Sequence, residues 1–318
     1  MFVVDELIYS QGKYKKILEF LKESLIKYFV ETVREDLKEA DFWYDRIERV
    51  IKSKSTDFIC FEVRNNSEVL GFIITRILKD EFFFIRHFFI LDIDDRQEVA
   101  YMLLKEASQR LISKYKINKF QNAAFTFPDD YLANPLKRIG FSILKRHNMT
   151  LNLKNFNKMF KLPPDFSFIP FNEEYMPKIA ELSIQTFRNH PDASFWDEIN
   201  SESLYLESLK ESLTTYLLAD CSILVMDENE NIVAFCLIEK GFEEDDFIIQ
   251  NIAVSKNYQG LGIGKALISK VLKITRDKGY KKAILTVTDG IPAQKLYESF
   301  GFKKYTSFNT ITNQKRTI

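Results

Sequence analysis

The sequence has 318 residues, of which 46% are hydrophobic and 28% are charged, and 45 basic side chains balance 45 acidic ones. Such a length and composition are typical of a soluble globular protein with two domains, each large enough to bury a core. A net charge of zero provides no overall field that would attract nucleic acid or anionic lipid, so any anion site must be local. The apolar stretches are too short, or too interrupted by charge, to span a bilayer.

Three cysteines, Cys60, Cys221 and Cys236, show no spacing typical of metal ligands. An odd number of thiols without such spacing is typical of a reducing compartment, with the thiols buried. The first residues carry no basic region before an apolar run, so we expect no secretory signal. We therefore expect a cytoplasmic protein with no metal and no membrane partner. The oligomeric state is not readable from the sequence.

In chain order, the first half alternates patterns of strands and helices. Apolar runs rich in β-branched and aromatic residues predict strands at 58–63, 69–76, 82–91 and 120–125. Helical spacing predicts helices at 98–115 and 131–139, and a strand after Gly140-Phe141 that continues to Leu153. Pro163-Pro164, after the polar stretch 154–161, then predicts a linker.

The second half repeats this order of elements. Its patterns predict strands at 166–171, 222–227, 232–239, 247–254, 283–287 and after Phe302, and helices at 173–187, 203–217, after Gly264 and at 292–300. An offset of 163 residues places Leu70–Ile73 on Val233–Cys236, and an offset of 161 places Gly140-Phe141 on Gly301-Phe302. We infer an internal duplication, with an α/β fold of mixed sheets, domains at 1–155 and 165–318, and a linker at 156–164.

A glycine loop lies between the predicted strand at 247–254 and the helix that follows it. Three of the ten glycines fall within Gln259–Lys265. A dinucleotide loop requires G-x-G-x-x-G after the first strand of its domain, and a P-loop requires four residues before Gly-Lys followed by Ser or Thr; neither spacing is met. The pattern Q/R-x-x-G-x-G/A is met by Gln259, Gly262 and Gly264. Amides at a helix N-terminus can bind a pyrophosphate there, and a Cβ would hold the phosphates away.

This loop resembles the acyl-CoA loop of the GNAT superfamily, the Gcn5-related N-acetyltransferases. Asn251–Val254 is similar to the family's strand before the loop, and Ala293–Phe302 matches the family's ending A-x-x-x-Y-x-x-x-G-F. The resemblance implies two tandem GNAT-like domains and acetyl-CoA as co-substrate. It implies cofactor contacts from the strand and the loop, namely Ile252, Ala253, Val254, Gln259, Gly260, Leu261, Gly262, Ile263, Gly264 and Lys265. Family members commonly carry an Asn where Gly290 and Asp289 stand, so we expect its contact with CoA to be absent or to come from another group.

Transfer of an acetyl group to an amine requires a base for the amine, donors for the oxyanion and a proton for the thiolate. The backbone N–H of Val254 suits the oxyanion, and the resemblance implies that Tyr297 is the proton donor. A phenol with a pKa of about 10 can protonate a thiolate; the alternative is that Tyr297 only packs its helix on the sheet. For the base, Glu239 at the end of its strand is one candidate, and an exposed strand-end charge is the equal alternative. His190 is a second candidate.

Two further groups of residues have both a structural and a functional interpretation. Trp196 and Phe195 either pack the core or line an acceptor pocket. The acidic run 243–246 is a solvated loop, or, if it lines the cleft, it favours a cationic acceptor.

The first half lacks the residues of the loop. Arg96–Tyr101 stands where the loop lies in the second half, with Glu98 adding a negative charge and Val99 in place of Gly262. Leu136 stands where Tyr297 lies. We therefore predict a degenerate first domain that completes the acceptor pocket or only stabilises the protein.

Taken together, these features predict an N-acetyltransferase that transfers the acetyl group of acetyl-CoA to a primary amine of a small molecule or peptide. The alternative is a non-catalytic regulatory protein that binds acyl-CoA. Charge balance and the lack of a basic helix disfavour a nucleic-acid partner.

Overall fold

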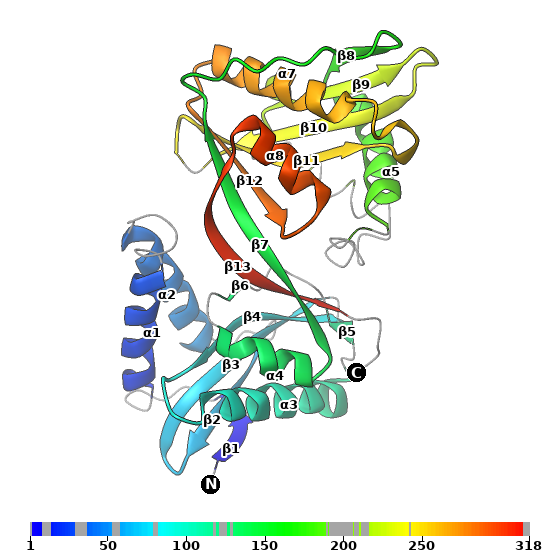
Figure 1. Ribbon diagram of the computed structural model, residues 1–318. Coiled ribbons are helices and arrows are strands. Elements are labelled where there is room, and N and C mark those ends of the chain that lie inside the picture. Colours follow the sequence, from blue (N-terminus) through cyan, green and yellow to red (C-terminus); the bar gives the residue numbers. More distant parts are fainter. Residues whose placement is uncertain are drawn as a thin grey trace. The chain divides into compact units, whose positions relative to one another are not determined.

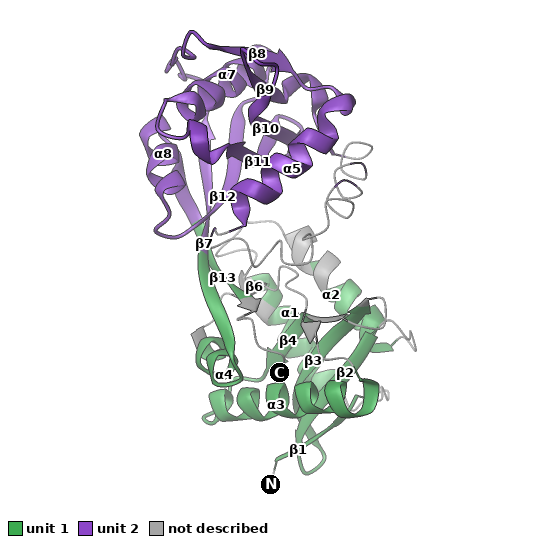
Figure 2. Cartoon of the chain, turned by 90° about the vertical axis from the view of Figure 1, so that its right-hand side faces the viewer, with its two compact units in different colours: residues 1–145, 306–318 green, residues 146–305 purple. Residues whose placement is uncertain are grey.

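The computed structural model describes residues 2–7, 14–28, 37–52, 58–78, 82–116, 119–120, 126–127, 130–188, 190, 206, 210, 216–241 and 243–313. The chain divides into two compact units (Figure 2). Unit 1 contains residues 1–145 and 306–318, and unit 2 contains residues 146–305. No helix in the described ranges combines the length and apolar character needed to cross a membrane.

Unit 1 is built on a five-stranded sheet with the order β1-β2-β3-β4-β5. Its strands are β1 (Phe2–Glu6), β2 (Phe58–Asn65), β3 (Glu68–Leu78), β4 (Phe82–Ile90) and β5 (Lys119–Phe120), with β6 (Thr126–Phe127) nearby in sequence. Its helices are α1 (Lys15–Tyr28), α2 (Leu37–Lys52), α3 (Arg96–Tyr115) and α4 (Ala133–Arg138) (Figure 1). The apolar stripe of α3, including Val99, Leu103 and Leu111, is fully buried in the same cluster as Phe61 and Phe72 of the sheet.

The second sheet is mixed and has eight strands in the order β6-β13-β7-β12-β11-β10-β9-β8, and its part from β7 to β8 forms the sheet of unit 2. The strands are β7 (Phe141–Asn152), β8 (Phe166–Pro170), β9 (Ile223–Asp227), β10 (Ile232–Lys240), β11 (Asp246–Val254) and β12 (Lys282–Thr288). The helices are α5 (Met176–Phe187), α7 (Ile263–Asp277) and α8 (Pro292–Phe300), and β13 (Lys303–Asn313) follows α8 (Figure 1).

The two faces of the sheet in unit 2 are covered by different helices. Side chains alternate along a strand, and on β10 Cys236 and Ile238 join the cluster that contains α7 and α8, whereas Phe235 and Leu237 join the cluster that contains α5. All four of these side chains have no exposed surface. The near-continuous apolar sequence of β10 is thus explained by burial on both faces.

The strands β7 and β13 each contribute to both units. Residues 146–152 of β7 pair antiparallel with β12 in unit 2, from Arg146 opposite Thr288 to Asn152 opposite Lys282. At the other end of the chain, Asn309 and Thr310 of β13 pair with β6 in unit 1. The compact units therefore differ from the predicted ranges 1–155 and 165–318. The prediction divided the chain at one place in the sequence, whereas β7 and β13 pair with strands on the other side of that place.

Both units carry the same irregularity in their central strand. β3 and β4 pair around one extra residue, Arg86, and β10 and β11 pair around one extra residue, Gln250. These residues are 164 positions apart (250 − 86), close to the offset of 163 that aligned the two halves of the sequence. A β-bulge is a specific feature of a strand pair, so its repetition supports the inferred duplication.

The predicted elements that fall in the described ranges are confirmed, and α8 occupies the predicted residues 292–300. Most of the predicted helix at 203–217 and most of the predicted strand at 120–125 lie outside the described residues; at the end of that helix, Leu217 forms a bridge with Glu239 instead. Three elements that precede the first predicted strand, β1, α1 and α2, were not predicted.

Candidate active site

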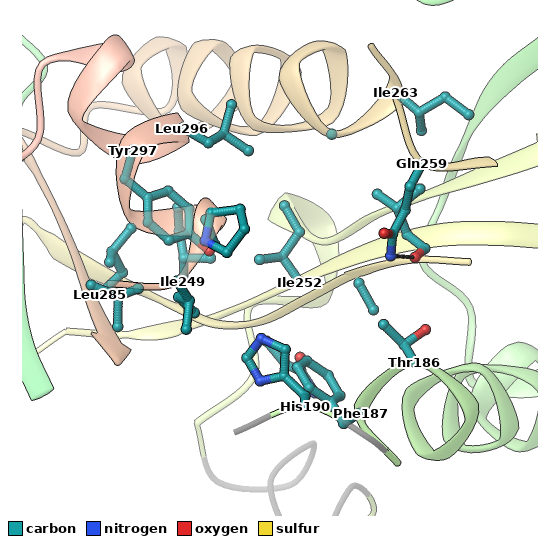
Figure 3. A pocket seen from close by; sticks show the side chains of 18 of the residues that line it. Thr186, Phe187, His190, Ile249, Ile252, Gln259, Ile263, Leu285, Leu296 and Tyr297 are labelled. Atoms are coloured by element: carbon teal, nitrogen blue, oxygen red, sulfur yellow. Dashed lines mark hydrogen bonds between the residues drawn. The ribbon is translucent and has the colours of Figure 1, made fainter. Parts of the chain in front are cut away.

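A cavity of about 830 Å³ lies in unit 2 where β11 and β12 separate (Figure 3). The two strands are parallel neighbours only from Asp246–Ile248 to Lys282–Ile284. The following residues of both strands, 249–254 and 285–287, line the cavity instead. Since the ladder between them ends there, this edge of β11 can pair with an extended ligand.

The glycine loop forms one end of the cavity. Gly260 and Gly262 have φ angles of +84° and +86°, which favour glycine, and α7 begins at Ile263 directly after them. The first hydrogen bond of the helix is donated by the Ala266 N–H to the Gly262 oxygen, at 3.0 Å. The amides before Ala266 therefore have no acceptor within the helix and are available to an anion.

Gln259 fixes this loop to the strand before it. Its side-chain Nε2 donates to the backbone oxygen of Val254, at 3.0 Å. The loop amides and the end of β11 thus form one continuous wall.

Gly264 lines the cavity at a position where the protein itself does not require glycine. Its φ lies outside the left-handed region, and an added Cβ would stand 3.7 Å from Val254 Cγ2 and 3.8 Å from Leu296 Cδ2, which is ordinary van der Waals contact. The protein itself has room for alanine here. A glycine here would let the pyrophosphate of CoA approach the backbone more closely than a residue with a Cβ.

The structure brings most of the predicted site residues together. Those that line the cavity are Ile252, Ala253, Val254, Gln259, Gly260, Gly262, Ile263, Gly264, Lys265 and Tyr297. Leu261 does not line the cavity, and its side chain is 53% exposed. Glu239 does not line it either: this half-buried residue pairs with Ile248 and forms a bridge with Leu217.

Tyr297 reaches the cavity from α8. Its side chain is only 7% exposed, and its ring packs against that of Phe302 with 5.9 Å between the centroids. Figure 3 shows Tyr297 beside Leu285 and Ile249, at the point where the two strands separate. The ring is therefore a packing element, and it also lies on the cavity wall, so the two interpretations of this residue are compatible.

The opposite side of the cavity is formed by the end of α5. Thr186, Phe187 and His190 line it, and Figure 3 shows them on the side of β11 opposite Tyr297. The backbone N–H of His190 donates to the backbone oxygen of Phe187 at 2.9 Å, and the two rings meet edge to face with their centroids 5.5 Å apart. The cavity thus connects the two faces of the sheet. The predicted pocket residues Phe195 and Trp196 lie outside the described residues.

The acidic run at 243–246 does not contribute to the cavity lining in the described structure. Asp245 pairs with Lys281 at 2.6 Å, and Asp246, which is 2% exposed, pairs with Lys282 at 2.8 Å. The hydrogen bond from Lys281 holds the pKa of Asp245 below its usual value. Two carboxylates of the run therefore bind lysines beside the β11–β12 pair.

Arg146 is a cavity residue that the sequence analysis did not identify. It lies on β7, opposite Thr288 of β12. The pairing joins segments about 140 residues apart in the sequence, and no local pattern around Arg146 indicates it.

Unit 1 lacks the loop, as predicted. Its helix α3 begins at Arg96 with no glycine, Val99 is fully buried, and Glu98 pairs with Arg138. The Arg96 side chain donates to the Ile90 oxygen at the end of β4, at 2.9 Å. Gln259 makes the equivalent bond in unit 2, so the first position of the motif kept its structural role in both halves.

Among the described residues, no group of three or more His, Cys, Asp or Glu side chains is arranged to hold a metal ion. The absence of a metal therefore stays a prediction.

This fold and site are those of an acyltransferase, and the comparisons with known proteins specify the family. Residues 176–302 match the profile of the Acetyltransferase (GNAT) family, so this part of the chain is a GNAT domain. The whole chain shares its fold with a GCN5-related N-acetyltransferase from Sphaerobacter thermophilus, with a TM-score of 0.60, 12% identity and coverage of 100% of this chain and 98% of the other. A tandem GNAT protein from the clavulanic acid biosynthesis pathway has a TM-score of 0.51 at 10% identity, covering 99% of this chain and 100% of its own. The tandem GNAT fold is thereby confirmed.

Curated relatives match over shorter segments. The [ribosomal protein bS18]-alanine N-acetyltransferase of Haemophilus influenzae is 33% identical over 81 residues, which are 26% of this chain and 54% of that protein. The N-acetylaspartate synthetase of Xenopus tropicalis is 44% identical over 66 residues, 20% of this chain and 24% of that protein. The chain therefore spans about half or less of the length of these relatives.

Proposed function

We propose that the protein transfers the acetyl group of acetyl-CoA to a primary amine of a small molecule or peptide, by direct attack of the amine. The observation that carries this proposal is the cavity itself, since the glycine loop, the free edge of β11 and Tyr297 all line it. The name of the Haemophilus influenzae relative, an alanine N-acetyltransferase, agrees with this activity.

Residues of unit 2 would hold the co-substrate. The amides at the start of α7 and the glycines before them suit the pyrophosphate, and Ile252, Ala253 and Val254 on β11 suit the pantetheine arm. When bound, acetyl-CoA supplies a thioester: the amine nitrogen forms a C–N bond with its carbonyl carbon, and the C–S bond breaks.

The surrounding side chains would handle the charge and the protons of this exchange. The backbone N–H of Val254, or of a neighbour at the end of β11, would donate to the developing oxyanion. Tyr297, on the face covered by α8, would donate its proton to the leaving thiolate.

Two residues remain candidates for the base that removes a proton from the amine. His190 lines the cavity, on the face covered by α5, and Glu239 does not. We therefore propose His190 as the base that accepts the proton of the amine. A role for Glu239 as the base would require an intervening water.

The proposal is tested by two measurements on the full chain. Binding of acetyl-CoA is measured by calorimetry, and release of free CoA is followed with a thiol reagent over a broad panel of primary amines. Binding together with amine-dependent CoA release supports the enzyme. Binding without release for any amine would instead identify a regulatory protein that binds acyl-CoA, and the absence of binding would contradict both.

A further inference from the structure

The charges that line the cavity indicate what kind of amine it accepts. Of the described lining residues, the permanently charged ones are Arg146 and Lys265, and none is Asp or Glu. A cationic acceptor such as a polyamine would find no carboxylate among them. We propose that the acceptor is an amino carboxylate, whose carboxylate group binds Arg146 while its amine faces the acetyl group. This inference rests on the proposed acetyl transfer.

The two cations lie at different places in the cavity. Lys265 is in the first turn of α7, and its Nζ lies over the ring of Phe160, 5.7 Å from the ring centroid. This position is at the glycine loop, where the phosphates of CoA are expected. Arg146 belongs to β7, on the other side of β12, and it therefore lines a part of the cavity away from the glycine loop.

Strand alternation determines which face of the sheet carries the side chain of Arg146. Its neighbours His147 and Met149 are 4% and 0% exposed, and Met149 packs in the cluster that contains α7 and α8. Side chains alternate along a strand, so Arg146 and Asn148 project from the opposite face, which is the face that α5 covers. Thr286, opposite Asn148, confirms this arrangement, because its Oγ1 lies 2.7 Å from Asn148 Oδ1.

A second observation on this face also indicates a ligand with acceptor oxygens. Thr186, near the end of α5, lines the cavity, and its hydroxyl oxygen is buried without a hydrogen-bond partner among the described residues. A buried hydroxyl is normally satisfied. A carboxylate can accept two hydrogen bonds from the guanidinium fork of Arg146 and another from a hydroxyl such as that of Thr186.

The reaction balances for such a substrate. The amine of the amino carboxylate loses a proton to the base and forms the amide bond, the carboxylate is unchanged, and CoA leaves as a thiol after receiving a proton from Tyr297. The product is an N-acetylated amino carboxylate with one positive charge fewer than the substrate.

The test compares acceptors that differ only in their carboxylate. Each of the twenty amino acids is paired with its amide, and the peptide Asp-Ala-amide is paired with Asn-Ala-amide, so that free amino acids and acidic peptides are distinguished as sources of the carboxylate. We expect kcat/KM for the preferred carboxylate acceptor to exceed that for its uncharged partner by about 10- to 100-fold, as for a charge-assisted hydrogen bond.

Variants of the protein connect this preference to Arg146. Arg146→Gln should remove the preference, and Arg146→Lys should retain part of it because the charge remains. Lys256→Gln is the matched control, since Lys256 is exposed and lies outside the cavity lining. Affinity for acetyl-CoA should be the same in all three variants, which shows that the fold and the loop are intact.

Two results separate failure of this inference from failure of the proposed function. Equal rates for the acid and the amide, or a preference that survives in Arg146→Gln, would overturn the amino carboxylate while leaving acetyl transfer in place. Absence of acetyl-CoA binding to the parent protein would overturn the proposed function and this inference with it.

Discussion

Replacing Tyr297 with phenylalanine should slow the chemical step without loosening the fold. The Tyr297 side chain is 7% exposed and its ring packs against Phe302, and phenylalanine keeps that ring contact. Loss of the hydroxyl should cost about 1 kcal/mol of unfolding free energy at most. Removal of a general acid costs about 100-fold in kcat or more, equivalent to about 3 kcal/mol in the transition state.

The assay is steady-state release of CoA from pH 6 to 10 at saturating acetyl-CoA, with calorimetric affinity for CoA measured alongside. Tyr280→Phe is the matched control. The ring of Tyr280 packs against that of Phe247, with 5.7 Å between the centroids, and Tyr280 does not line the cavity. An unchanged kcat and pH profile in Tyr297→Phe, within about threefold of the parent, would refute the assignment of Tyr297 as the acid.

Three further predictions concern the loop, the Cys221 thiol and the pairing of β7 with β12. Gly264→Ala should unfold at the same temperature as the parent but bind CoA at least about tenfold more weakly. Gly262→Ala should also lose about 1–2 kcal/mol of unfolding free energy, because the φ of Gly262 is +86°. Equal affinity of Gly264→Ala and the parent for CoA would contradict a close contact of the ligand with Gly264. Burial raises the pKa of the Cys221 thiol to about 11, so labelling by iodoacetamide at pH 8 should be slow until the protein is unfolded, and rapid native labelling would contradict this. Residues 165–318 expressed alone lack the segment of β7 that pairs with β12 and should associate or melt at a lower temperature than the full chain, as measured by gel filtration and circular dichroism.

The sequence predicted the parts of the site that are local along the chain. The glycine loop, the strand before it and α8 each consist of contiguous residues whose spacing determines their structure, and ten predicted residues from them line the cavity. Glu239 was chosen from its place at the end of a strand, and the structure places it outside the lining, since strand order alone does not fix which side chains face a cavity.

The unpredicted parts depend on pairing between distant segments. Arg146 enters the site only because β7 pairs with β12, and register between strands so far apart has no signature in either segment. The repeated bulge at Arg86 and Gln250 was hidden for a related reason, because a bulge is defined by the partner strand as much as by its own sequence.

The division of β7 and β13 between the two units has a consequence for how the protein is made. Unit 1 includes residues 306–318, so a ribosome must reach these residues before unit 1 can acquire its last strand. Synthesis proceeds at about 5–20 residues per second, which leaves an incomplete N-terminal half exposed for roughly 10 to 30 seconds. Unit 1 can therefore not be completed before unit 2 is translated, and premature termination anywhere in the second half would leave unit 1 incomplete as well.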